Sequence, residues 1–272
     1  MGPIERIAAL PMYDMPQLTA AHDALWTWFA QRLSQVGLSC VPASLSRQLS
    51  YQDSWRHPGL LLGQGCEYPL ATSHVGYVRP IATPSYAAEG CEGGYYRSAL
   101  VVRTQDSAER LDDLRGRRCV LNDSSSNSGM NLLRAAVAPL ARGAAFFSSV
   151  SVSGSHRRSI EMVASGQADL AAVDCVSWAH LRRHDPAQTS MLRVLGWSPR
   201  SPSLPFITAL TTDDRSVAEL VAALEELGTD STLKNIRQEL LLQGAERYSG
   251  SGYVEVLRLQ RYATELNYSH VR

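Results

Sequence analysis

Short apolar runs alternate with longer amphipathic runs along most of this 272-residue chain. Residues 59–63 contain three consecutive leucines and are typical of a fully buried strand, whereas residues 18–36 place Leu25, Phe29 and Leu33 at helical spacing. Strands that alternate with helices in this way fold into α/β domains. We therefore expect an α/β protein.

The same patterns predict the extent of each element. Strands are expected at residues 6–10, 40–45, 59–63, 78–83, 99–103, 119–121, 146–152, 168–173 and 207–211. Helices are expected at residues 18–36, 130–140, 157–164, 176–183, 217–227, 233–242 and 254–266.

The length exceeds that of one typical hydrophobic core, so we expect two lobes. Residues 198–205 carry three prolines and cannot form a regular helix or a central strand, which indicates that the chain leaves the second lobe there. The predicted division is residues 1–100 for the first part of lobe 1, residues 101–205 for lobe 2, and residues 206–272 for a return to lobe 1. Two crossings would form a hinge that closes around a ligand. One continuous sheet is the alternative.

Charge and hydropathy exclude several classes of protein. The 26 basic and 26 acidic residues give a formal net charge of zero, and no segment is strongly basic, which argues against a nucleic-acid partner. No stretch reaches the roughly 18 apolar residues of a membrane helix. Residues 1–10 lack the basic start and long apolar core of a secretion signal, so a cytoplasmic location and an exported chain whose signal has been removed both stay open.

The chain has five cysteines: Cys40, Cys66, Cys91, Cys119 and Cys175. They form no CxxC pair, which argues against zinc sites and thioredoxin-like chemistry. We expect most of them to be buried free thiols, and a disulfide between Cys66 and Cys91 is the less favoured alternative. The sequence indicates no metal and no cofactor.

A polar run at residues 122–129 lies between an expected strand and an expected helix. Its hydroxyl and amide groups supply donors, and the helix that follows exposes unpaired backbone N–H groups at its positive end. Such groups together form an anion site. The run contains no Lys or Arg, so binding would use neutral donors, which suits a dehydrated tetrahedral oxyanion. The alternative is a surface loop in which Asn127 or Ser128 only caps the helix.

Other candidate residues also follow expected strands. His156 could donate a hydrogen bond to an oxyanion, although a histidine at such a turn is more often a cap or a surface residue. Asp174 ends the strand expected at residues 168–173, where it could receive an amino group of the ligand or cap the next helix. Tyr13 and Tyr68 follow strands of lobe 1, where a phenol can hydrogen-bond one end of a ligand.

Catalytic signatures are missing from the sequence. It contains no GxSxG elbow, no P-loop and no HExxH motif. Nothing identifies an oxyanion hole or an acid that would orient His156 beside a serine nucleophile. We therefore expect a binding protein and not an enzyme.

Four segments resemble the periplasmic solute-binding proteins of phosphate and phosphonate importers, which have the type II periplasmic-binding fold. Residues 111–123 resemble the segment that leads into that family's anion loop, and residues 126–129, Ser-Asn-Ser-Gly, are similar to its Ser-Thr-Ser-Gly. Residues 154–156 resemble the segment with its ligand-contacting histidine, and residues 166–174 resemble its Gly-x-Ala-Asp strand. Residues 4–13 and 61–70 extend the likeness into lobe 1.

The resemblance implies a protein that captures a small tetrahedral oxyanion, such as a phosphonate, phosphate or phosphite, between two lobes for an ABC importer. It implies that the head of the ligand is held by Ser126, Asn127, Ser128 and His156. It also implies that Tyr13 and Tyr68 close over the ligand from lobe 1, and that Asp174 is a weak candidate for its other end.

Two features depart from the family's pattern. Asn127 stands where the family has a threonine, and no secretion signal is visible to support the periplasmic location that the resemblance implies. We expect a monomer whose partners are the ligand and an ABC permease. The alternatives are a cytoplasmic ligand-sensing domain or orphan binding paralogue, and an enzyme resembling the pyrimidine synthases of thiamine biosynthesis. Such an enzyme would be expected to show a cysteine-rich motif, which the scattered cysteines do not supply.

Overall fold

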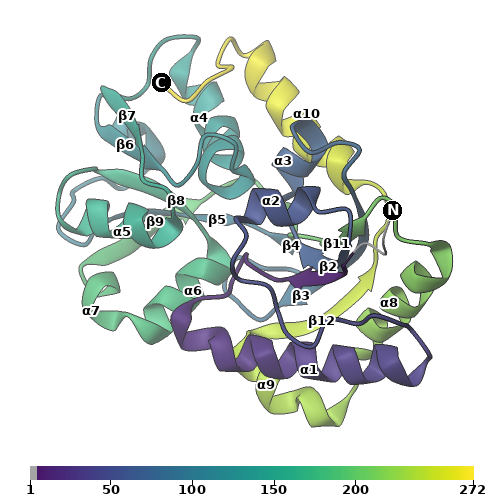
Figure 1. Cartoon of the computed structure of the whole chain (residues 1–272). Coiled ribbons are helices and arrows are strands. Elements are labelled where there is room, and N and C mark those ends of the chain that lie inside the picture. The colour runs from purple at the N-terminus through teal and green to yellow at the C-terminus, as the bar shows by residue number, and fades with distance from the viewer. Residues whose placement is uncertain (1–4) are drawn as a thin grey trace. The chain divides into compact units, whose positions relative to one another are not determined.

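The computed structural model describes residues 5–272 (Figure 1). The chain forms two compact units, each built around its own five-stranded sheet. Unit 1 contains the residues up to Ala87 together with Ser203–Ser251. Unit 2 contains Ala88–Pro202 together with Gly252–Arg272. The expected α/β class is confirmed.

The sheet of unit 1 has the strand order β1-β2-β11-β3-β12. Its strands are β1 (Ile7–Ala9), β2 (Leu60–Gln64), β3 (Val78–Tyr86), β11 (Phe206–Ala209) and β12 (Leu242–Arg247). β1 and β2 are parallel, whereas β11 pairs antiparallel with both β2 and β3. Every residue of β2 is buried, as its run of leucines predicts.

Helices of unit 1 pack around this sheet (Figure 1). They are α1 (Thr19–Gln35), α2 (Tyr51–Arg56), α3 (Glu67–Thr72), α8 (Asp214–Glu226) and α9 (Lys234–Glu239). α1 buries Leu25, Phe29 and Leu33 on one face and contacts α8 and α9. The helical spacing of these apolar residues therefore predicted both the helix and its buried face.

The sheet of unit 2 has the strand order β7-β6-β8-β5-β9. Its strands are β5 (Ser98–Arg103), β6 (Arg118–Leu121), β7 (Ser149–Val152), β8 (Leu170–Asp174) and β9 (Leu192–Trp197). β7, β6 and β8 run parallel to one another, whereas β5 is antiparallel to β8. A separate two-stranded ladder pairs β4 (Tyr95–Tyr96) with β10 (Ser201–Pro202).

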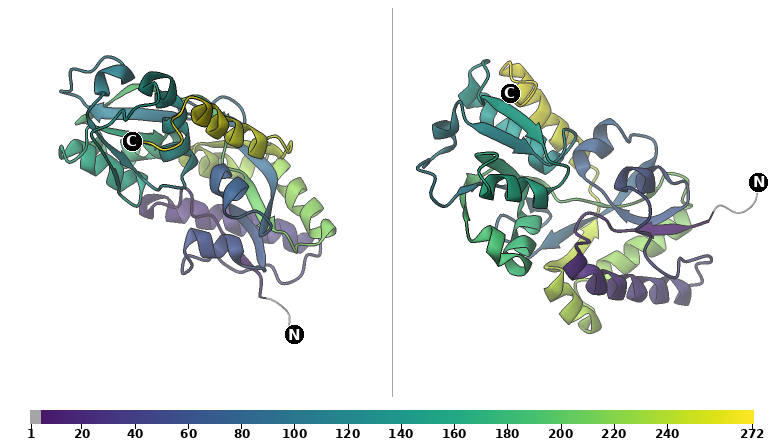
Figure 2. Two further views of the ribbon diagram at one scale, coloured as in Figure 1. Left: turned by 90° about the horizontal axis from the view of Figure 1, so that it is seen from above. Right: turned by 60° about the vertical axis from the view of Figure 1, so that its left-hand side comes forward.

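Unit 2 also contains a helix from the end of the chain. Its helices are α4 (Leu132–Ala141), α5 (His156–Ala164), α6 (Cys175–His184), α7 (Pro186–Thr189) and α10 (Gly252–Glu265). α10 packs against α4, and the two lie side by side in both views of Figure 2. Over residues 5–272, no helix is long and apolar enough to cross a membrane.

The division of the chain differs from the expected one. The chain passes between the units at three places, after Ala87, Pro202 and Ser251, and not at two. The third passage brings α10 into unit 2, where Asn131 donates to the carbonyl of Val256 and Arg134 donates to the carbonyl of Ser269. These contacts join residues more than a hundred positions apart, so the amphipathic pattern of α10 alone could not assign it to a unit.

Two expected elements are also wrong. Residues 40–45 form no strand, because Cys40 adopts a positive φ of 56° and Pro42 has no N–H to donate to a ladder. The helix expected at residues 233–242 ends early, at Glu239, and Leu241 just beyond it has a φ of 54°. The chain then continues as β12, which pairs antiparallel with β3.

The cysteines are less buried than expected. Only Cys119 and Cys175 are buried, whereas Cys66 and Cys91 are half-buried and Cys40 is exposed in its turn. All five are free thiols in the structure, so Cys66 and Cys91 are not bonded to each other.

Candidate functional site

Three neighbouring parallel strands of unit 2 end at the same edge of the sheet. β6 leads into the serine-rich loop, β7 leads into the turn before His156, and β8 ends at Asp174. Ligands of open α/β sheets gather outside the carboxyl ends of parallel strands. The topology therefore brings to one edge the three segments of unit 2 that the sequence singled out.

The serine loop passes into a helix through a π-helical turn, Asn127–Asn131. Ser126 caps this turn: its Oγ accepts a hydrogen bond from the N–H of Gly129 at 3.0 Å. The N–H of Asn131 donates to the carbonyl of Ser126 at 3.0 Å, which closes the wide turn. π-Helical turns are rare and frequently occur at functional sites.

The side chain of Asn122 occupies the space beside Gly129 where a Cβ would lie. A Cβ built on Gly129 would lie 1.8 Å from Oδ1 of Asn122, so a larger residue would require the Asn122 side chain to move. The contact holds the start of the polar run against the π-helical turn. The glycine of the Ser-Asn-Ser-Gly segment is therefore explained by packing within the loop.

Ser128 is the centre of a small cluster of polar side chains. Its Oγ lies 2.9 Å from Nε2 of His156 and 3.3 Å from Oγ of Ser126. Its carbonyl accepts a hydrogen bond from Oγ of Ser98 at 2.9 Å, which anchors the loop to β5. Ser126 and Ser128 are only 7% and 4% exposed, so their hydroxyls lie in a largely dehydrated environment.

His156 is neutral at physiological pH. Burial lowers the pKa of its imidazole from 6.5 to about 4. Its Nδ1 is shielded from solvent and has no hydrogen-bond partner among the described residues. The imidazole therefore forms one hydrogen bond, between Nε2 and the hydroxyl of Ser128.

The side chain of Asn127 does not lie with this cluster. Its amide donates to the phenol oxygen of Tyr96 at 3.1 Å and to Oγ of Ser201 at 2.8 Å, and the residue is fully buried. Its carbonyl oxygen accepts from the amide of Asn131 at 2.8 Å. The expectation that this side-chain amide donates to a ligand has no support in the structure, because both amide hydrogens are used inside unit 2.

Asp174 caps a helix. Its Oδ1 accepts hydrogen bonds from the N–H groups of Val176 and Ser177 at 2.9 and 3.0 Å, and the residue is 2% exposed. Of the two roles that the sequence left open, the capping role is the one observed. A contact with the far end of a ligand stays a prediction.

The two predicted tyrosines belong to unit 1. Tyr13 is 6% exposed and meets the ring of Tyr86 edge to face, with a centroid distance of 5.3 Å. It lines a cavity of about 20 Å³ together with Gln64, whose amide donates to Tyr86. Tyr68 lies in α3 and is 8% exposed. Both tyrosines are therefore largely buried in unit 1.

Three supporting residues were not identified from the sequence. Ser98, Tyr96 and Ser201 fix the serine loop by the hydrogen bonds described above. Tyr96 and Ser201 are 31 and 74 positions from Asn127, so no local pattern connects them with the loop. Only the pairing of β4 with β10 brings them together.

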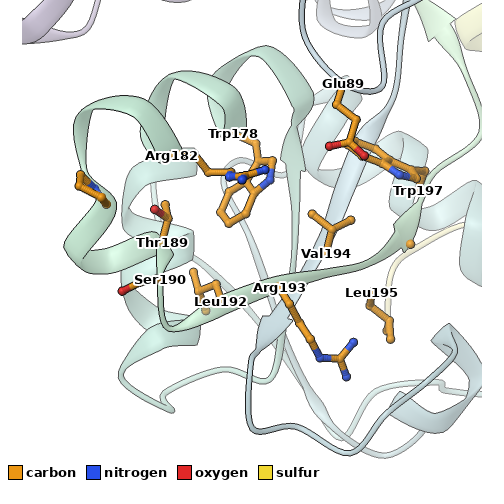
Figure 3. Close-up of a pocket in the computed structure, with 12 residues that line it drawn as sticks. Glu89, Trp178, Arg182, Thr189, Ser190, Leu192, Arg193, Val194, Leu195 and Trp197 are labelled. Atoms are coloured by element: carbon orange, nitrogen blue, oxygen red, sulfur yellow. The ribbon is translucent and has the colours of Figure 1, made fainter.

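Unit 2 also has a surface groove of about 740 Å³, which Figure 3 shows. Trp178 and Arg182 line it from α6, and Arg193, Val194 and Trp197 line it from β9. None of the predicted ligand-binding residues lies in its lining. The groove is open and partly aromatic, unlike the buried hydroxyl cluster that suits a dehydrated oxyanion.

The sequence was compared with models of known protein families and with known proteins. The sequence model of a family described as the periplasmic substrate-binding protein of phosphonate ABC transporters matches residues 7–253. No curated protein matches the sequence.

Several solved structures share the fold. PhnD1 from Prochlorococcus marinus, in complex with methylphosphonate, has a TM-score of 0.73 at 17% identity, with 97% of this chain and 100% of that chain covered. A binding-protein component of an ABC phosphonate transporter from Pseudomonas aeruginosa has a TM-score of 0.74 at 17% identity, covering 96% and 87%. XAC2383 from Xanthomonas citri, bound to ATP, has a TM-score of 0.72 at 14% identity, covering 99% and 100%.

Proposed function

Since the chain belongs to the periplasmic substrate-binding proteins of phosphonate ABC transporters, we propose that it captures a small tetrahedral oxyanion through Ser126, Ser128 and His156. Proteins of this family are substrate-binding components and not enzymes. We propose a phosphonate, phosphate or phosphite as the ligand, and an ABC permease as the partner that receives it.

The observation that carries the proposal is the contact between Ser128 and His156. A hydroxyl and a neutral imidazole, 2.9 Å apart, stand at the start of a helix and beside the hydroxyl of Ser126. Each of the three groups can turn a hydrogen toward an oxyanion, and the first N–H groups of a helix have no acceptor within that helix. Hydrogen bonds to a charged acceptor are stronger than those between neutral groups.

Binding would replace the hydrogen bond between Ser128 and His156 with hydrogen bonds from both residues to the ligand. In the structure, the hydroxyl of Ser128 and Nε2 of His156 satisfy each other. An oxyanion would accept from both groups, with His156 in the tautomer that carries its hydrogen on Nε2. Since burial keeps this imidazole neutral, the site relies on dipoles and the helix terminus, and selects by geometry more than by net charge.

The other predicted residues take different parts in the proposal. The side chain of Asn127 supports the loop through its hydrogen bonds to Tyr96 and Ser201, and only its backbone would face the ligand. The type II fold implies that a second unit completes the site, and we assign that part to Tyr13 and Tyr68. Asp174 stays a candidate for an amino group at the far end of the ligand.

A thermal-shift screen tests the ligand class. The probes are phosphate, phosphite, methylphosphonate, aminoethylphosphonate and sulfate. A ligand at 100 times its dissociation constant should stabilise the protein by about 2.7 kcal/mol. We expect at least one phosphorus oxyanion to raise the unfolding midpoint more than sulfate does. A protein that responds to none of the five would contradict the proposed function.

A further inference from the structure

Two thiols distant in the sequence lie in contact inside unit 2. The Sγ atoms of Cys91 and Cys175 are 3.3 Å apart, although 84 positions separate the two residues. Cys91 follows the first passage between the units, and Cys175 is the first residue of α6. Neither thiol belongs to the serine and histidine cluster.

A glycine makes this approach possible. Gly90 has a positive φ of 97°, and a Cβ at this position would lie 2.7 Å from the ring of Trp197 and 3.1 Å from Cβ of Cys175. The segment before Cys91 can therefore lie directly against β9 and the start of α6 only because residue 90 has no side chain.

The backbone holds both thiols in place. The N–H of Cys91 donates to the carbonyl of Ala88 at 3.0 Å, and the N–H of Cys175 donates to the carbonyl of Arg97 at 3.2 Å. The neighbouring pair Ser98 and Asp174 is in register between β5 and β8. The two sulfur atoms therefore meet because both chain segments are fixed, and not because two long side chains happen to touch.

We propose that Cys91 and Cys175 form a reversible intramolecular disulfide when the protein meets a disulfide oxidant. A disulfide has its sulfur atoms about 2.05 Å apart, so closing the present separation needs a shift of roughly 1.3 Å, within reach of small side-chain rotations. This modification goes beyond the proposed oxyanion binding and does not depend on it. Periplasmic proteins work in an oxidising compartment, where such bonds persist.

The chemistry is thiol–disulfide exchange with a reagent such as glutathione disulfide. The thiolate of Cys91, which is half-buried and so the more accessible of the two, attacks the reagent and releases one glutathione thiolate. Cys175 then loses its proton and attacks Sγ of Cys91, which releases the second glutathione. Two cysteine thiols are oxidised, one glutathione disulfide is reduced to two thiols, and the two protons pass to the glutathione thiolates.

The second step requires the thiolate of Cys175. The hydrogen bond with Cys91, followed by burial and the neighbouring carboxylate of Asp174, raises the pKa of the Cys175 thiol far above its usual range. Closure should therefore accelerate as the pH rises, because the fraction of Cys175 present as thiolate increases.

Thiol counting on the whole chain tests the proposal. The protein is purified under reducing conditions, incubated with glutathione disulfide, freed of the reagent and titrated in denaturant with a thiol reagent. The reduced protein has five thiols, and we expect the oxidised protein to have three, since one disulfide consumes two. Dithiothreitol should restore the full count. A count that stays at five would overturn the proposal.

Peptide mapping identifies which thiols react. Trypsin leaves Cys66 and Cys91 in one peptide, residues 57–97, because Arg79 precedes a proline, so the map is made on Cys66→Ser. We expect residues 57–97 linked to residues 159–182, which contain Cys175. A link from either peptide to Cys40 or Cys119 in place of this one would contradict the assignment.

Single variants and a stability measurement complete the test. Cys91→Ser and Cys175→Ser should show no loss of thiols under the same oxidation, whereas the matched control Cys40→Ser, at an exposed thiol, should lose two as the wild type does. Oxidation should raise the unfolding midpoint of the wild type by roughly 5 °C, an increase that dithiothreitol reverses. An equal increase in Cys91→Ser would count against the bond.

Discussion

His156 illustrates how far a single residue can be interpreted from sequence. Its place after a strand and before a helix predicted a position at the sheet edge, and the structure places it beside Ser128. Its neutral state was not predictable, because that state depends on burial by surrounding segments. The site therefore differs from one built on a charged histidine, even though the residue was correctly placed.

The lowered pKa of His156 predicts a pH effect on stability. The unfolded chain takes up a proton on this histidine near pH 6.5, whereas the folded protein does so only near pH 4. The stability that depends on the neutral imidazole is therefore present above pH 6.5 and decreases as the pH falls toward 4. Replacing His156 by Gln removes this contribution.

The measurement compares chemical unfolding of wild type and His156→Gln at pH 7 and pH 5. Between these pH values the wild type should lose more stability than the variant, by on the order of 1–2 kcal/mol. His270→Gln, at an exposed histidine, is the matched control and should behave as the wild type does. Equal losses in wild type and His156→Gln would show that the imidazole is not desolvated.

Asn127 marks the limit of interpretation at the residue scale. In the sequence, an asparagine stands where the related family has a threonine, so its side-chain amide was expected to contact the ligand in place of a hydroxyl. The structure turns the amide toward Tyr96 and Ser201, so the substitution changes how the loop is supported. Because those partners come from distant segments, only a three-dimensional structure could reveal them.

At the scale of elements, apolar patterning succeeded where a helix or strand buries one regular face. α1, α5 and β2 all appear close to where their patterns predict them. β12 was missed because its sequence, Leu-Gln-Gly-Ala-Glu-Arg, has neither a regular alternation nor β-branched residues. It is a strand because it pairs with β3, and that pairing is a tertiary contact.

An ion-pair cluster joins three strands of the unit 2 sheet at the end away from the serine loop. Asp169 precedes β8 and accepts hydrogen bonds from Arg103 of β5 at 2.7 Å and from Arg118 of β6 at 2.9 and 3.0 Å. Burial alone would raise the pKa of this carboxyl, but the hydrogen bonds from Arg118 and Arg103 hold it far below its usual range. The aspartate of the Gly-x-Ala-Asp segment therefore has a structural role.

Replacing Asp169 by Asn should destabilise unit 2 by about 3 kcal/mol, because two arginines lose their shared buried partner. The matched control is Asp112→Asn, since Asp112 pairs with Arg115 at the surface and should contribute less than about 1 kcal/mol. Urea unfolding of the two variants measures the difference. Equal effects would mean that the Asp169 cluster contributes no more than a surface pair.

At the scale of the whole molecule, the ordered motifs predicted the family, and the family match over residues 7–253 confirms it. The division of the chain was predicted less well, since the sequence pattern suggested two passages between the lobes and the structure has three. Motifs report which local segments are present, whereas the third passage depends on how α10 packs against α4. The fold class was therefore accessible from sequence and the assignment of the last helix was not.

The central claim is that Ser128 and His156 hold the oxyanion, and calorimetry tests it most directly. The titration uses the phosphorus oxyanion that stabilises the wild type most, added to wild type, to Ser128→Ala/His156→Ala, and to a control double variant, Ser149→Ala/His270→Ala, at exposed positions of unit 2. We predict that the site variant binds at least about 100-fold more weakly, since two hydrogen bonds to a charged group are lost, while the control binds as the wild type does. A folded site variant with unchanged affinity would contradict the account.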